Sequence, residues 1–214
     1  MKTDALISML ARGPVEADLR TTPRRISLAT ASGLVVAVVA MWSVLGPRPD
    51  LASAVAIPMF WLKFMVPLGL AAAFFIASSR LARPGEQAKS AWTAVAMMLV
   101  ILWVAAVISL WAAPAAQRAS MVEGTSSWSC VASIALLAMP LVVCVLLAMR
   151  GLAPTRPKWA GAAAGGLAGS VAALVYAVHC TEMTLPFLAV WYILGIAAPA
   201  VLGSVIGPRF LRWT

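Results

Sequence analysis

Residues 159–178 read WAGAAAGGLAGSVAALVYAV, twenty consecutive residues without a charge. A bilayer core is about 30 Å thick, and a helix of about 20 apolar residues spans it. The run is continuously apolar and does not alternate, so it predicts a transmembrane helix and not a barrel strand. Gly161, Gly165 and Gly169 recur every fourth residue. This strip of small residues predicts a close approach to a neighbouring helix.

Five further stretches of the same kind flank this one. They cover residues 26–46, 56–79, 91–113, 129–149 and 184–206. The chain is 63% hydrophobic and 11% charged, with a mean hydropathy of +0.95, which lies outside the range of soluble domains. We therefore expect an all-α integral membrane protein, a bundle of six transmembrane helices over residues 26–206. Residues 1–25 form an N-terminal arm, and residues 207–214 form a short tail.

The basic residues are distributed unevenly among the connectors. Thirteen of the sixteen Lys and Arg residues lie in the arm, in the second and fourth connectors and in the tail, whereas the other connectors carry only Arg48 and Arg118. The positive-inside rule places the first group, and both termini, in the cytoplasm. Topology thus accounts for the net charge of +9, and we expect no direct contact with nucleic acid.

The arm contains one short segment suited to binding a partner. Thr3 or Asp4 can cap a helix on which Leu6, Ile7 and Leu10 lie largely on one side. A helix of about ten residues is marginal in water. It gains order by laying its apolar face on a partner protein or on the lipid bilayer, and the residues alone leave both readings open.

The opposite face carries a second group of residues. Cys130 begins the fourth span, while His179, Cys180 and Glu182 occupy the short turn between the fifth and sixth spans. Both cysteines are therefore expected at the outer membrane face, which is oxidising in a bacterial envelope. Cys144 lies 14 residues further along the fourth span, about 21 Å deeper, and is interpreted as a packing residue.

Three interpretations of the external cysteines stay open. They can form a structural disulfide, or act as a reversible thiol pair that senses oxidants and electrophiles. They can also bind a soft metal such as zinc, cadmium or copper with help from His179 and Glu182. Because His179 and Cys180 are adjacent, chelation by both requires the turn to unwind. We expect no required cofactor.

Lys63 is the only clear charge well inside a span. We expect its side chain to extend to the outer interface instead of pairing within the bundle. No charged pathway accompanies it, which disfavours an ion-coupled transporter. The sequence contains no Walker motif, Rossmann fingerprint, HExxH or nucleophile elbow, so the protein is not expected to be an enzyme.

The chain also resembles a known family. The opening MKTDALISMLARGPVEADL, Cys130 near the start of a span, and HCTEMTLPFLAVWYILGIAAPAVLGSVIGPRFLRW (residues 179–213) are similar to the NrsF family of membrane anti-sigma factors. The resemblance covers essentially the whole chain. It implies six spans and an arm that holds an extracytoplasmic-function sigma factor at the bacterial inner membrane. It also implies that Cys130 and Cys180 respond to heavy-metal or oxidative stress.

On this reading the arm binds the sigma factor, with Leu6, Ile7 and Leu10 as its apolar contacts. Two other classes compete with it. One is a small polytopic transporter of metal ions or apolar compounds that uses helices bent at proline, and activity in sealed vesicles would reveal it. The other is a scaffold subunit of a larger membrane complex, which would co-purify with other membrane proteins.

Overall fold

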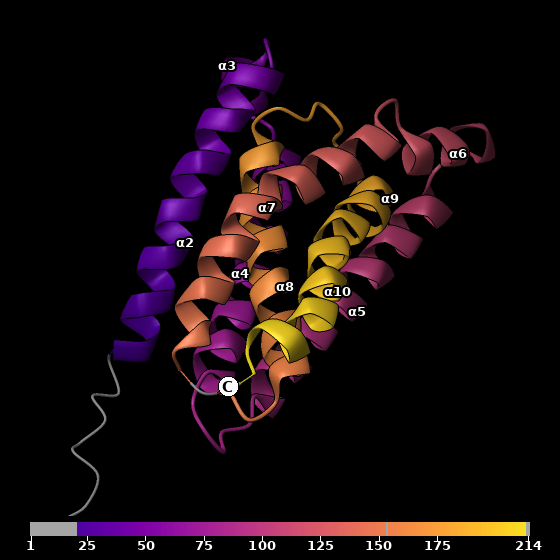
Figure 1. Ribbon diagram of the computed structural model, residues 1–214. Helices are drawn as coiled ribbons and strands as arrows, with labels where there is room; N and C mark the ends of the chain where they lie inside the picture. The colour runs from indigo at the N-terminus through magenta and orange to yellow at the C-terminus, as the bar shows by residue number, and fades with distance from the viewer. Residues whose placement is uncertain (1–20, 153, 213–214) are drawn as a thin grey trace, which may run out of the picture.

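The computed structural model describes residues 21–152 and 154–212, and all regular structure in these residues is helical (Figure 1). Six helices are long and apolar enough to cross a membrane, which confirms the predicted number of spans. They are α2 (Thr21–Ala40) with its continuation η1 (Met41–Leu45), α4 (Pro58–Leu81), α5 (Lys89–Ala112), α7 (Ser127–Arg150), α8 (Pro157–Ala177), and α9 (Leu185–Phe187) continued by η2 (Leu188–Tyr192) and α10 (Ile193–Phe210). Leu6, Ile7 and Leu10 lie outside the described residues.

The ends of the helices differ from the predicted spans by at most five residues. The largest difference is at α2, which begins at Thr21 and includes Arg24 and Arg25. Hydropathy marks the hydrocarbon core, whereas a helix continues into the interface, where charged side chains are tolerated. Pro58 and Pro157 stand at the starts of α4 and α8, where a missing N–H group costs little.

Two short helices were not predicted. They are α3 (Leu51–Ala54) and α6 (Ala115–Glu123), and both lie in connectors at the same end of the bundle (Figure 1).

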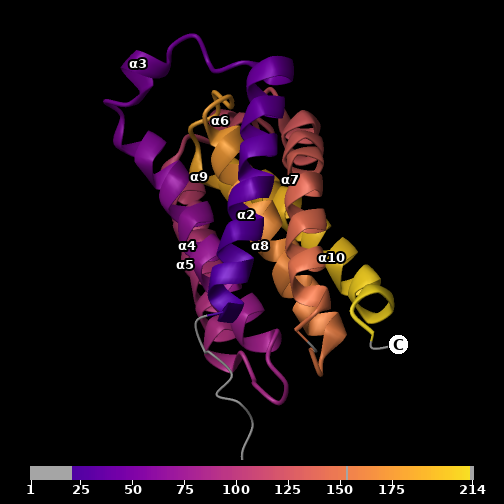
Figure 2. The ribbon, with the colours of Figure 1, turned by 60° about the vertical axis from the view of Figure 1, so that its left-hand side comes forward.

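Helix α8 is the centre of the bundle. Sixteen of its 21 residues are buried, and it packs against α4, α7 and α10 (Figures 1 and 2). Helix α2 packs on α7, and α5 packs on α4. Both outlying helices expose large apolar side chains, among them Val35, Val39, Ile101 and Ile108. In a chain of this composition these faces are the lipid-facing surface.

The glycine strip predicted on α8 packs against α10, which confirms the expected close approach. A Cβ atom on Gly161 would overlap the carbonyl oxygen of Gly203, and one on Gly165 would overlap that of Pro199. On the facing helix, a Cβ on Gly207 would overlap the carbonyl oxygen of Pro157. The two backbones are therefore in direct contact, which only glycine permits.

The two ends of the bundle differ in charge. The starts of α2, α5 and α8 and the ends of α4, α7 and α10 lie at one end (Figure 1). This basic end carries Arg24, Arg25, Arg80, Arg83, Lys89, Arg150, Arg156, Lys158, Arg209 and Arg212. The opposite end, here called the cysteine end, carries Arg48 and Arg118.

Candidate functional site

The turn of residues 178–184, between α8 and α9, is the centre of the cysteine end. It carries Cys180, while Cys130 lies in the first turn of α7. Cys130 is 0% exposed and Cys180 is 3% exposed, and their thiols lie close enough to interact electrostatically. Both are free thiols. The structure therefore brings the two predicted cysteines together. Cys144, further along α7, is half-buried.

His179 and Glu182 have other partners. Nδ1 of His179 lies 2.7 Å from the carbonyl oxygen of Gly46 and donates to it. The Glu182 carboxylate accepts hydrogen bonds from the backbone N–H of Thr125 at 2.8 Å and from its hydroxyl at 2.7 Å. Within the part of the chain that the structure describes, no three His, Cys, Asp or Glu residues are grouped to hold a metal ion. A four-residue metal site stays a prediction, and it requires both side chains to leave these partners.

Lys63 lies inside the bundle, so the prediction that it extends to the interface was wrong. Lys63 is 1% exposed. Its Nζ atom donates to the carbonyl oxygens of Cys180 at 2.6 Å and of Glu182 at 3.0 Å. It also lies 5.5 Å from the ring centroid of Tyr192. The physical reason is that carbonyl groups of the turn have no partner within a helix, and they lie within reach of the ammonium group.

A second buried cation ties another connector to the turn. Arg48 is 6% exposed and forms a bidentate salt bridge with Asp50. Its Nε atom donates to Oδ1 at 2.7 Å and its Nη2 atom to Oδ2 at 2.6 Å. Its backbone N–H donates to the carbonyl oxygen of Val178 at 3.2 Å, and its Nη1 lies 3.5 Å from that of Cys180. The hydrogen bond to the Asp50 carboxylate raises the pKa of Arg48 and lowers that of Asp50.

The surroundings of Cys180 favour its thiolate form. The pKa of Cys180 is lowered because the Cys130 thiol donates a hydrogen bond to its sulfur and because the Lys63 ammonium lies close by, although burial acts in the opposite direction. A thiolate is the nucleophilic and metal-binding form of cysteine. Cys180 is therefore suited to react with oxidants, electrophiles or soft metal ions.

Two tyrosines complete the wall around the thiols. The rings of Tyr176 and Tyr192 lie 6.0 Å apart, and that of Tyr176 lies 5.6 Å from the His179 ring. The Tyr192 hydroxyl is buried and has no hydrogen-bond partner among the described residues. Sequence reasoning missed both tyrosines. The chain's two tyrosines both stand in apolar spans close to Cys180, and that coincidence was the available signal.

Two π-helical segments adjoin this site. Segment η1 ends at Leu45, directly before Gly46, whose φ of 70° suits glycine. Segment η2 carries Tyr192. Short π-helical turns inside α-helices frequently occur at functional sites.

These features define a six-span helical membrane protein with a buried pair of thiols at one end. Residues 10–213 match the family described as negative regulator of sigma F, NrsF. The probable anti-sigma-F factor NrsF of Azospira oryzae is 42% identical over 215 residues, and the anti-sigma-F factor NrsF of Caulobacter vibrioides is 38% identical over 214 residues. Both matches cover 100% of each chain. No solved structure gives a significant match.

The chain therefore belongs to the NrsF family of anti-sigma factors, and the resemblance in its sequence is confirmed. The family is regulatory.

Proposed function

We propose that the protein holds an extracytoplasmic-function sigma factor at the cytoplasmic face of the bacterial inner membrane. It releases the sigma factor when Cys130 and Cys180 respond to heavy-metal or oxidative stress outside. The positive-inside rule orients the basic end, with both termini, toward the cytoplasm. The observation that carries the proposal is the buried thiol pair at the opposite end. One of its members, Cys180, lies in a turn bonded to the connector that follows α2 and η1.

Helix α2 offers a short physical route from the thiols to the arm. The turn contacts Gly46 and Arg48, directly after α2 and η1, through His179 and Val178. The other end of α2 follows residues 1–20, which contain the proposed sigma-binding contacts Leu6, Ile7 and Leu10.

Helix α7, which carries Cys130, contacts the middle of α2. A Cβ atom on Gly33 would lie 2.8 Å from the Cα atom of Leu141. Both cysteines thus lie on elements in contact with the helix that leads to the arm.

The thiol pair supports two kinds of chemistry. In oxidation, Cys130 and Cys180 form one disulfide bond and pass two electrons and two protons to hydrogen peroxide, which becomes two water molecules. In metal binding, a soft divalent cation such as Cd²⁺ binds both thiolates and displaces their two protons. Either event removes the thiol–thiol hydrogen bond beside Lys63. The bundle responds only when the modified pair favours one packing over another.

The first test replaces both cysteines. The C130S/C180S variant should bind the sigma factor as the wild type does, and a sigma-dependent reporter should no longer respond to cadmium or peroxide. The matched control is C144S, which removes a thiol outside the pair and should leave induction unchanged. Normal induction in the double variant would contradict the sensor function.

The second test concerns the arm. Detergent-purified full-length protein and a version lacking residues 2–20 are compared for the soluble proteins that they retain from host lysate. A sigma factor retained by the full-length protein alone supports the proposal. L6A, I7A and L10A should each weaken its retention. If no soluble protein depends on the arm, the anti-sigma mechanism proposed for it is wrong, and transport activity in vesicles would then favour the transporter.

A further inference from the structure

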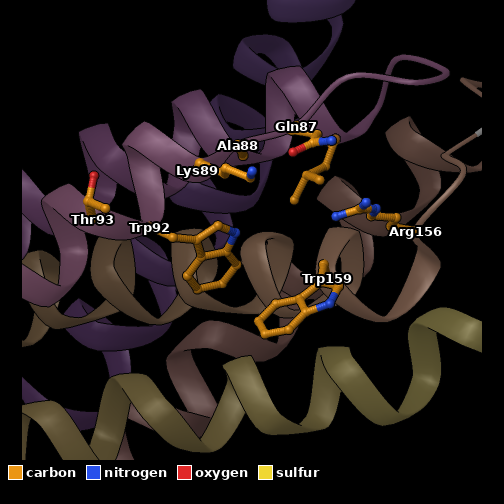
Figure 3. Close-up of a pocket in the computed structure, with 8 residues that line it drawn as sticks. Gln87, Ala88, Lys89, Trp92, Thr93, Arg156 and Trp159 are labelled. Carbon is orange, nitrogen blue, oxygen red and sulfur yellow. The ribbon is translucent and has the colours of Figure 1, made fainter.

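A groove at the basic end lies far from the cysteine pair. It has a volume of about 590 Å³ and is lined mainly by the start of α5, the start of α8 and the connectors before them (Figure 3). Lys89 and Arg156 enter it from different segments, and the indole rings of Trp92 and Trp159 lie beneath them. Cations and indoles in one groove at a helix end are the groups that phospholipid head groups contact.

The depth of these side chains follows the layers of a bilayer. Lys89 is the first residue of α5 and Trp92 lies three residues further in, while Arg156 precedes α8 and Trp159 lies two residues inside it. At 1.5 Å per residue, the Cα atoms of the two tryptophans lie about 4.5 Å deeper than those of the two cationic residues. Phosphate groups lie above the ester and acyl region, so the cations lie at phosphate depth and the indoles below it.

The charge of the groove favours an anion. Both Lys89 and Arg156 are exposed, and none of the described residues that line the groove is acidic. Glu86 is close in sequence, but its carboxylate pairs with Arg83 at 3.3 Å, and it lines a separate groove with Pro23 and Phe75. Two uncompensated cations therefore share one opening.

The walls of the groove are held together. The Trp92 and Trp159 rings are in edge contact, with centroids 5.3 Å apart and planes at 71°. The backbone N–H of Gly85 reaches the Thr155 hydroxyl at 3.4 Å, which joins the two connectors. These contacts join the two walls, so binding a ligand requires little ordering of the backbone.

We propose that this groove binds one anionic phospholipid. Its phosphate lies between Lys89 and Arg156, and its glycerol and upper acyl region cover Trp92 and Trp159. The ligand is recognised by its apolar body, which distinguishes it from free phosphate, and by a net negative charge at the head group, which distinguishes it from a zwitterionic lipid. The proposal rests neither on the thiols nor on the proposed sigma binding.

Native mass spectrometry of the full-length protein tests this proposal. The protein is released from micelles that contain equal amounts of phosphatidylglycerol and phosphatidylcholine. The wild type should retain one phosphatidylglycerol molecule, and K89Q/R156Q should bind it about thirtyfold more weakly, given the typical contribution of two basic residues near an anionic surface. The matched control K158Q/R209Q removes two exposed cations from the same end, outside the groove, and should bind like the wild type.

Three results would overturn the proposal. Equal weakening in both double variants would mean that the basic end attracts lipid only through its total charge. Equal retention of phosphatidylcholine, whose phosphate is balanced by a choline cation, would show that the groove does not select a net negative charge. Displacement of the lipid by millimolar glycerol phosphate would show that the groove takes a free phosphate ester. Because all four substituted side chains are exposed, each variant should retain the wild-type unfolding transition.

Discussion

Helix α8 makes two very different contacts, along its side and at its end. Along α10, Gly161 and Gly165 bring backbone against backbone. At its end, the turn of residues 178–184 is held by hydrogen bonds from segments far apart in the sequence. Close packing fits only one arrangement, whereas polar groups can exchange partners. The comparison indicates that the glycine contact acts as a fixed frame, whereas the hydrogen-bonded turn can rearrange. Under the proposed function, a signal from the thiols would therefore pass to the elements bonded to the turn.

The glycine contact should tolerate change least. G165A places a methyl group against the carbonyl oxygen of Pro199, a backbone atom that cannot rotate away. We expect a loss of about 3 kcal/mol in unfolding free energy, the upper part of the range for overpacking. Unfolding of purified protein in mixed micelles of increasing SDS content measures this loss.

The control for this variant is G195A on α10. There a Cβ atom would lie 3.0 Å from side-chain carbons of Ile134, which can shift. We expect a loss of about 1 kcal/mol. Equal losses at both glycines would show that the contact between α8 and α10 is not the rigid part of the bundle.

The next largest effect on stability is expected at the cysteine end. K63M removes the donor to the carbonyl oxygens of Cys180 and Glu182. The buried carbonyl oxygen of Cys180 then lacks the ammonium donor. We expect destabilisation by about 2 kcal/mol, measured in the same micelle titration. K158M, which removes an exposed cation at the basic end, should change stability by less than about 0.5 kcal/mol.

The same lysine should control the pH dependence of Cys180. Because the pKa of Cys180 is lowered in the folded protein, alkylation by iodoacetamide should reach half its maximal rate at a lower pH than in a denatured chain, where a thiol pKa is about 8.5. K63M should move this midpoint upward. Peptide mass spectrometry separates Cys180 from Cys130 and Cys144, and equal midpoints in folded and denatured protein would contradict the prediction.

The lowered pKa of Cys180 also makes the stability of the folded protein depend on pH. A group whose pKa is lowered on folding stabilises the protein above its unfolded pKa, and the contribution is lost as the pH falls through the folded pKa. Reduced wild-type protein should therefore lose the part of its stability due to Cys180 on acidification. C180S should lack this part of the pH dependence.

Local patterns made much of the fold predictable from sequence. A run of about 20 apolar residues specifies a span without knowledge of its neighbours, and the spacing of Gly161, Gly165 and Gly169 specifies a close contact. The partner of that contact, α10, was not specified. The meeting of Cys130 and Cys180 was predictable in part, because alternating spans place both at the same face.

The polar contacts of the site could not be predicted in this way. The position of Lys63 depends on the carbonyl of Cys180, 117 residues further along the chain. Arg48 was counted only as an external charge, and its burial depends on Asp50 and on the same turn. Hydropathy places a charged residue at the interface or inside the bundle according to its position along the span. The positions of the Lys63 and Arg48 side chains instead depend on carbonyl groups of the turn, which come within reach only in the folded protein.

The smallest effect is expected at the exposed edge of the turn. E182A removes the acceptor for the backbone N–H and the hydroxyl of Thr125. Water can replace the lost acceptor because Thr125 is exposed, so we expect a loss of about 1 kcal/mol. Hydrogen exchange at the Thr125 amide should accelerate, whereas E123A, at an exposed site nearby, should leave it unchanged. If E182A leaves exchange and stability unchanged, the turn is held mainly by its buried cations, Lys63 and Arg48. Its proposed connection to α2 then depends on the contacts with Gly46 and Arg48 alone.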